Sequence, residues 1–391
     1  MRGFAMRHAA TPWAPPTAEQ VGLIGTHWSK GWIIENNVVS HSVCSGIALG
    51  KHGDAFDNTS ARHRRGLRQD DRARPGPAAG TRTPSAATSS ATTPSPTASR
   101  PGSSAAWARP SATVTGNTIH DIHVRQLFTG AEMAGIKFHG AIDVAIARQP
   151  YLPDLSAASG STGWPRARAS RGNLFHDNTA EDLFVEVDHG PFLVDNNIFL
   201  SPRTLLSVSQ GGAYVHNLIA GSILSIAYDA RLTPFHRAHD TAVAGMHDNP
   251  FGDDKYINNL FVGPGDLSVY DQAPLAVKMA GNVFLNGAKP SKHEREPVVD
   301  PGSGPAPKLL EKGDGFYLRI AFDGAFGGRK RPLVTSALLG KAAIPDLPYE
   351  RPDGSPIRID RDYFGKTRPS SGPTPGPFES PGTGLLELKV R

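Results

Sequence analysis

Residues Arg171 to Ser207 read RGNLFHDNTAEDLFVEVDHGPFLVDNNIFLSPRTLLS. Within this stretch an asparagine followed by two large apolar residues occurs twice, at Asn173 and at Asn197. The intervals between successive copies of this pattern, continued along the chain, are 24, 20, 42 and 23 residues. A repeat of this length is typical of a solenoid, in which each turn stacks a short strand on its neighbours. The later copies of the pattern begin at Asn217, Asn259 and Asn282.

The spacing of these asparagines predicts a parallel β-helix. If the 42-residue interval counts as two periods, the mean step is close to one coil of such a fold. Asparagine side chains aligned at one corner can hydrogen-bond from coil to coil along the stack. Asn37 and Asn117 extend the same signature toward the N-terminus. We therefore predict an all-β solenoid with a loop-rich C-terminal cap.

Composition favours one elongated, soluble unit. The chain of 391 residues is rich in Gly and Pro, with 42 and 34 copies, which indicates many turns. Its net charge of +5 does not predict a nucleic-acid partner, because nine arginines fall in the single segment 61–112. The lone Cys44 excludes an intrachain disulfide, and the absence of a run of about eighteen apolar residues argues against a membrane partner. No signal peptide is visible, which favours a cytoplasmic location.

Two windows break the repeat. Residues 61–112 contain no Ile, Val, Phe, Tyr or Asn, and residues 147–172 contain no Ile or Val. Sequence of this kind cannot bury enough apolar surface to fold, so we expect 61–112 to be disordered. One explanation is a natural Ser/Pro/Thr-rich insertion. The other is that both windows are read out of frame, because a one-base shift of TGWPRAR, which starts at Thr162, permits DWMAQGT.

These observations divide the chain into four parts. Residues 1–60 are expected to form coils, and because no cap precedes them we expect an N-terminally truncated fragment. The low-complexity segment 61–112 follows. Residues 113–307 form the β-helix core, interrupted by the window 147–172. Residues 308–391 form the C-terminal cap.

The segment LFVEVDH carries the candidate catalytic carboxylate. Strand alternation places Val185 and Val187 on the inward face. Glu186 and Asp188 then face outward with Phe184, over a surface suited to an extended sugar chain. A glutamate partly desolvated by an aromatic neighbour can act as a general acid. The alternative is an ordinary solvated glutamate on the surface.

Four segments resemble glycoside hydrolase family 120, whose members are right-handed parallel β-helix β-xylosidases. The resemblance implies a right-handed coil and retaining hydrolysis of terminal β-xylosides in xylo-oligosaccharides. It implies no cofactor and no catalytic metal. The segments are LIGTHWSKGWIIENN, FTGAEMAGIKFHGAIDV, the stretch from RGNLFHDN to HNLIAGSI, and IDRDYFGKTRPSSGPTPGPFESPGTG.

The resemblance assigns the acid/base role to Glu186 and reveals a missing partner. The family's nucleophile is an aspartate about one coil earlier, which falls near Thr162 or Gly163. No aspartate is present there, and Asp154 has no apolar strand around it to make it a substitute. A retaining glycosidase needs two carboxyl groups about 5 Å apart, so we expect the chain as written to be catalytically impaired.

Four further residues are candidate sugar ligands. The resemblance makes Glu132 and His139 ligands of sugar hydroxyls, facing the same groove from adjacent coils, whereas the alternative is a structural hydrogen bond between coils. His27 and Trp28 could form a hydrogen-bonding and stacking platform for a pyranose ring, although Trp28 could equally lie in the core.

Two alternatives to the enzyme remain, and one possible metal site is rejected. The chain could be a non-catalytic β-helix that only binds sugar, which the missing aspartate favours, or a structural β-helix without a sugar role. His120 and His123 could suggest a metal, but they fall on opposite faces of a strand, so we predict no catalytic metal. A structural Ca²⁺ stays open.

Overall fold

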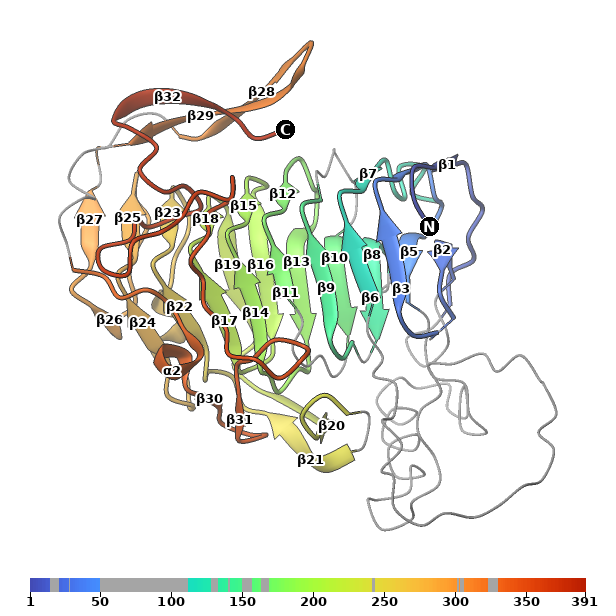
Figure 1. Cartoon of the computed structure of the whole chain (residues 1–391). Coiled ribbons are helices and arrows are strands. Elements are labelled where there is room, and N and C mark those ends of the chain that lie inside the picture. The colour runs from blue at the N-terminus through green and yellow to red at the C-terminus, as the bar shows by residue number, and fades with distance from the viewer. Residues whose placement is uncertain are drawn as a thin grey trace.

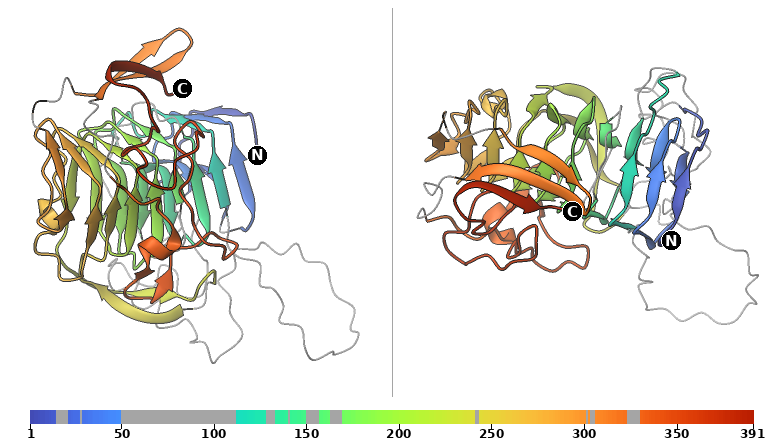
Figure 2. Two further views of the ribbon diagram at one scale, coloured as in Figure 1. Left: turned by 60° about the vertical axis from the view of Figure 1, so that its left-hand side comes forward. Right: turned by 90° about the horizontal axis from the view of Figure 1, so that it is seen from above.

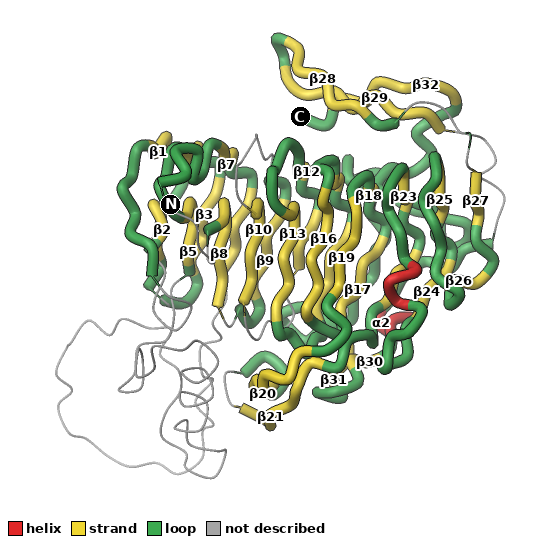
Figure 3. Tube along the Cα trace, turned by 180° about the vertical axis from the view of Figure 1, so that it is seen from behind, coloured by secondary structure: helices red, strands yellow, loops and turns green. Residues whose placement is uncertain are grey.

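The computed structural model describes residues 1–14, 21–27, 29–49, 112–127, 133–139, 141–149, 157–162, 169–240, 243–300, 302, 306–322 and 330–391. Within these residues the regular structure is almost entirely strand, and the short α-helix α2 (Ser336–Leu339) is coloured red in Figure 3. Strands from successive coils stack in parallel along one axis (Figure 1). The fold is a right-handed parallel β-helix, which confirms the predicted fold class. In the described part of the chain no helix is long and apolar enough to span a membrane.

The first face of the coil is a seven-stranded parallel sheet, called sheet one below. Alternate side chains of its strands point into the coil, as the period of two in the sequence requires. In spatial order its strands are β19 (Ser222–Ser225), β16 (Arg203–Val208), β13 (Glu181–Glu186), β10 (Ala157–Thr162), β8 (Ala134–His139), β5 (Ser45–Ala48) and β2 (Gly22–Gly25).

The second face is a nine-stranded parallel sheet, called sheet two. In spatial order its strands are β26 (Glu294–Arg295), β24 (Lys278–Ala280), β22 (Lys255–Ile257), β17 (Gly212–Val215), β14 (Phe192–Asp195), β11 (Ala169–Arg171), β9 (Val144–Ala147), β6 (Ala112–Thr115) and β3 (Trp32–Glu35).

The third face consists of two shorter parallel sheets in line with each other. The first contains β1 (Ala5–Arg7), β4 (Val38–Ser40) and β7 (Thr118–His120). The second contains β12 (Leu174–Phe175), β15 (Ile198–Phe199), β18 (Leu218–Ile219), β23 (Leu260–Val262), β25 (Val283–Leu285) and β27 (Val298–Asp300).

Like residues stack on like residues inside the coil. The rings of Phe175 and Phe199 stack with their centroids 4.9 Å apart, and those of Tyr214 and Tyr256 stack at 4.6 Å. Both pairs are buried, so each contributes apolar area together with the favourable geometry of offset aromatic rings. The repeat in the sequence therefore becomes a repeat in the core.

The predicted asparagine ladder is confirmed. Asn197 donates from Nδ2 to Oδ1 of Asn217 at 3.1 Å, and Asn217 donates in turn to Asn259 at 3.0 Å. The backbone N–H of each rung donates to the same oxygen, so every side chain both accepts and donates. The full ladder contains Asn37, Asn117, Gln149, Asn173, Asn197, Asn217, Asn259, Asn282 and Glu294.

The residue before each rung from Asn37 to Asn282 explains a second regularity of the sequence. It has a positive φ, which turns the chain at the corner and favours glycine or asparagine because their Cβ clash is absent or tolerated. These residues are Asn36, Gly116, Arg148, Gly172, Asn196, His216, Asn258 and Gly281.

The ladder passes through one of the two aberrant windows. Gln149 accepts the backbone N–H of Asn117 at 2.8 Å and donates its own to Oδ1 of Asn173 at 2.9 Å, so it is a rung that the asparagine pattern overlooks. In the same window β10 and β11 pair with strands on both sides. The coil path thus continues through 147–172 where it is described. The other aberrant segment, 61–112, lies outside the described residues except for Ala112, which begins β6.

The treatment of the 42-residue interval as two periods is wrong. Asn217 bonds directly to Asn259, and β18 pairs directly with β23, so the interval is a single coil. Its extra length forms an antiparallel hairpin, β20 (Asp229–His236) and β21 (Val243–Asn249), that projects from one edge of the stack (Figure 1). A long insertion at a coil corner leaves the rung intact, because loop length costs little once the two ends are fixed.

The last rung predicts a pH dependence of stability. Burial raises the pKa of Glu294 to about 7, although hydrogen bonds from Asn282 oppose the shift. The folded chain then holds a proton that the unfolded chain releases near its ordinary pKa of 4.5, so stability falls as pH rises from about 5 to about 8. Glu294→Gln should remove about 2 kcal/mol of this fall, measured by denaturant unfolding at several pH values. An unchanged pH profile in the variant would contradict the assignment.

The C-terminal region lies along the flank of the stack. An antiparallel sheet of β28 (Lys308–Lys312), β29 (Gly315–Phe322) and β32 (Gly384–Lys389) packs over the third face. Residues 330–380 cover the outside of sheet two, where Val334, Tyr349 and Ile359 pack on β14, β17 and β22. Figure 2 shows this red segment beside the coils. The rest of its regular structure is β30 (Lys341–Ala342) and β31 (Leu347–Pro348).

Candidate functional site

Glu186 ends β13 on the outer face of sheet one. Val185 and Val187 are buried in the core, whereas the side chains of Phe184 and Glu186 are partly exposed. This confirms the predicted inward and outward assignment for these four residues.

The outward assignment of Asp188 is wrong. Val187 has a φ of 53°, which ends the strand and reverses the alternation after Glu186. Asp188 is consequently 0% exposed, and its backbone N–H donates to Oγ of Ser209. Alternation predicts orientation only inside a strand, and the end of β13 had no signal in the sequence.

The register of sheet one places Thr162, the position at which the sequence led us to expect a nucleophile, beside Glu186. Thr162, at the end of β10, is the direct partner of Glu186 in β13. Parallel neighbours are about 4.8 Å apart, which is close to the separation of about 5 Å between the carboxyl groups of a retaining glycosidase. His139, at the end of β8, is the partner of Thr162 on its other side. Three adjacent strands therefore end in one row: His139, Thr162 and Glu186.

An arginine from the inserted hairpin holds Glu186. Nη1 of Arg231 lies 2.6 Å from Oε1 of Glu186, and its Nη2 lies 2.9 Å from Oδ2 of Asp229. The three side chains are 8 to 15% exposed, and the Nε of Arg231 donates to both oxygens of Asp229 at 3.0 Å. Burial opposes the charge of Arg231, but the two carboxylates hold its pKa above the usual value. The cluster carries two negative charges and one positive charge.

The hairpin is fixed to the coil beside Glu186 by buried hydrogen bonds. Oγ1 of Thr233 in β20 donates to the carbonyl oxygen of Val187, and it accepts from Nε2 of His189 at 2.9 Å. Nδ1 of His189 accepts from the amide of Gln210. Arg231 is therefore presented to Glu186 from a rigid support.

The remaining predicted ligands are partly outside the described residues. Glu132 and Trp28 are outside them. The backbone of His139 belongs to β8, two strands from β13, or about 10 Å. His27 follows β2, the fourth strand from β13, with an exposed side chain and a φ of 49°. It lies about 19 Å from the Glu186 position along the sheet.

The histidines considered for a metal have separate partners. Nδ1 of His120 lies 2.7 Å from Oδ2 of Asp121, and Nδ1 of His123 lies 2.7 Å from the carbonyl oxygen of Val43. The described residues contain no group of three or more His, Cys, Asp or Glu side chains arranged to hold a metal ion.

Sequence reasoning missed Arg231 and Asp229, which complete the cluster at Glu186. Their segment was taken as part of an unseen coil because of the 42-residue interval. The sequence did contain a signal for this strand, in the segment DARLTPFH. Arg231, Thr233 and Phe235 occupy every second position in it, as expected for a strand outside the repeat.

Comparison with known proteins gives one close structural relative. The coordinates match a solved structure described as the complex structure of XylC with xylose, with a TM-score of 0.81 and 29% sequence identity. The match covers 100% of this chain and 66% of that protein, so the chain spans slightly less than two thirds of its length. No protein-family model and no curated protein sequence matches the chain.

Proposed function

We propose that this chain is a glycoside hydrolase-type β-helix of the family 120 kind that binds the terminal β-xylosyl unit of a xylo-oligosaccharide at the outer face of sheet one. Glu186 is its acid/base residue. The observation that carries the proposal is the row formed by Glu186 and Thr162, whose spacing suits the two carboxyl groups of a retaining glycosidase. The structural similarity to XylC, which was solved with xylose, supports a sugar ligand.

The reaction would require a carboxylate that the chain lacks. In the first step a carboxylate at position 162 attacks the anomeric carbon while Glu186 protonates the departing oxygen. In the second step Glu186 takes a proton from a water molecule whose oxygen attacks the anomeric carbon, and the bond to the carboxylate breaks, which releases the sugar. Threonine at position 162 has no carboxylate and cannot form the glycosyl-enzyme. We therefore propose that the chain as written binds the sugar but hydrolyses it poorly or not at all.

Glu132, His139, His27 and Trp28 are proposed as sugar ligands along the same face. His139 is the nearest of those in described strands, and His27 would contact a more distant sugar unit. A non-catalytic sugar-binding protein is the second candidate, because the absent carboxylate favours it.

Calorimetry with xylobiose tests the binding. The full chain should bind xylobiose, and Glu186→Ala should weaken binding about tenfold, while Glu387→Ala, on the distant β32, should not change it. An assay with an aryl β-xyloside separates the enzyme from the binding protein. A chain that shows neither saturable binding nor hydrolysis would contradict both candidates and leave the structural β-helix.

A further inference from the structure

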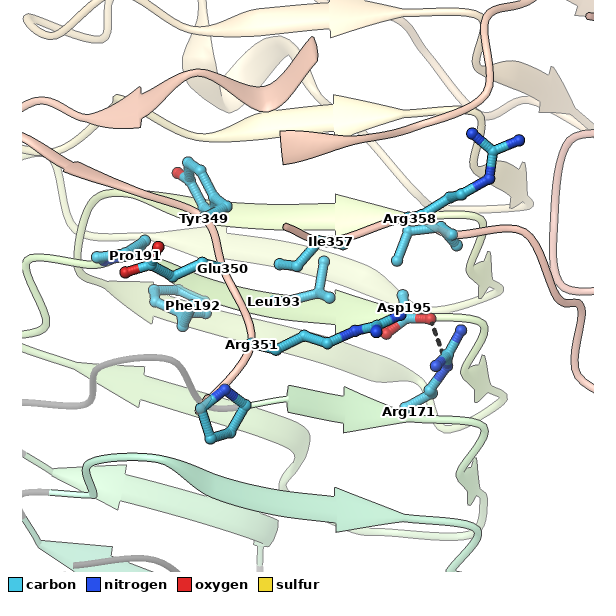
Figure 4. Close-up of a pocket in the computed structure, with 12 residues that line it drawn as sticks. Arg171, Pro191, Phe192, Leu193, Asp195, Tyr349, Glu350, Arg351, Ile357 and Arg358 are labelled. Carbon is cyan, nitrogen blue, oxygen red and sulfur yellow. Dashed lines mark ion pairs between the residues drawn. The ribbon is translucent and has the colours of Figure 1, made fainter. Parts of the chain in front are cut away.

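A pocket lies between sheet two and the C-terminal region (Figure 4). It has a volume of about 90 Å³, which suits a small molecule rather than a polymer. One wall comes from β11 and β14, and the other comes from residues 349–359. Pro191, Leu193 and Ile357 supply apolar surface.

The floor of the pocket contains an incompletely bonded carboxyl group. Asp195 is 0% exposed, and its Oδ2 accepts from Nε of Arg171 at 2.9 Å and from Nδ2 of Asn196 at 2.8 Å. Its Oδ1 is buried without a hydrogen-bond partner among the described residues. A buried oxygen left unpaired costs stability, and a ligand hydroxyl would satisfy it.

The rim of the pocket is basic. Arg171 lies on one side, and Arg351 and Arg358 lie on the other, as Figure 4 shows. The contact of Arg358 with Asp360 is 3.5 Å long, and Arg351 interacts electrostatically with Asp353 in its own turn. Glu350 also lines the pocket, and its Oε1 lies 2.9 Å from Nε2 of His239.

The rim is held in place before any ligand arrives. The backbone N–H of Arg351 donates to the carbonyl oxygen of Ser355 at 2.9 Å, which closes a tight turn. The hydroxyl of Tyr349 donates to the carbonyl oxygen of Gly211 at 2.9 Å, and the N–H of Ile359 donates to that of Val334. A site fixed in this way loses little conformational entropy on binding.

We propose that this pocket binds a small carboxylate that also carries hydroxyl groups, the chemical class of the sugar acids. Arginine presents a planar pair of N–H donors that matches a carboxylate. A hydroxyl of the ligand donates to Oδ1 of Asp195. The apolar surface of Pro191, Leu193 and Ile357 contacts the C–H groups on one face of the sugar ring. The ligand and the site are separate from those of the proposed reaction.

Calorimetry of the full chain with D-glucuronate tests the proposal. Glucuronate should bind, and acetate, which has no hydroxyl group, should bind at least tenfold more weakly. The double variant Arg351→Ala, Arg358→Ala should weaken glucuronate binding at least tenfold and leave xylobiose binding unchanged. Both arginines are exposed, so thermal unfolding should show a folded variant. Arg319→Ala, an exposed arginine on β29, is the matched control.

Three results would overturn the proposal. The first is the absence of saturable binding of glucuronate. The second is unchanged binding in the double variant, which would place glucuronate elsewhere on the molecule. The third is equal binding of acetate, which would remove the role of Asp195 and reduce the site to a simple anion contact.

Discussion

Thr162→Asp is expected to raise the hydrolysis of an aryl β-xyloside about a thousandfold over that of the chain as written. The introduced carboxylate would lie one strand from Glu186 and supply the nucleophile that the proposed reaction requires. Thr162→Asn is the matched control, because it has the same shape without the charge and should stay inactive. If the single change falls short, the replacement of 162–168 by the shifted-frame sequence DWMAQGT should recover activity.

When Glu186→Gln is added to the active Thr162→Asp variant, or to the variant with 162–168 replaced, the protein should lose most of its turnover. The loss should be smallest for substrates whose leaving groups are already acidic, because these need no protonation. A plot of rate against leaving-group acidity for both proteins measures this difference. Ordinary turnover by the unaltered chain, or an unaffected Glu186→Gln variant, would show that Glu186 and position 162 are not the catalytic pair.

Asn217→Leu is expected to lower the free energy of unfolding by about 4 kcal/mol. The Asn217 side chain makes four hydrogen bonds within the buried ladder: it accepts twice from Asn197 and donates to Asn259 and to the carbonyl oxygen of Val194. Leucine has a similar volume but leaves the partners unpaired in the interior, and each unpaired group costs about 1 kcal/mol or more.

The control for the ladder is an asparagine outside it. Asn36→Gly removes an exposed carboxamide at a position of positive φ that glycine adopts freely, so its effect should be below about 1 kcal/mol. Denaturant unfolding of the three proteins gives the comparison. A loss at Asn217 no larger than that at Asn36 would show that the ladder contributes little to stability.

The fold was predictable because its signal is repeated. A single Asn-apolar-apolar triplet means little, but Asn173, Asn197 and Asn217 in series specify one corner of a coil, and the hydrogen bonds are those expected. The repeat pattern did not include Gln149, because the pattern was defined by asparagine alone. Its interval of 24 residues to Asn173 nevertheless fits the repeat. The flank packing of 330–380 had no such signal, since it depends on contacts between segments far apart in the chain.

The site was less predictable for the same reason. The burial of Val185 and Val187 follows from local alternation, and Glu186 was identified from its strand. Arg231 contacts Glu186 from an insertion 45 residues later in the chain. The periodic pattern of the coils cannot predict the position of a residue in such an insertion. The orientation of Asp188 depends on where β13 ends, and the backbone turn at Val187 determines that end.

The asparagine ladder also has a direction. Each rung receives hydrogen bonds from the coil before it and donates to the coil after it, so every interior rung is interchangeable with its neighbours. A whole coil, together with its rung, could therefore be duplicated or deleted, and the rungs on either side could still hydrogen-bond to each other. The exception is Glu294, whose carboxyl oxygens accept from Asn282 and end the series. In such a protein, evolution can vary the chain between two rungs freely, as the β20–β21 hairpin illustrates, while the rungs keep the register.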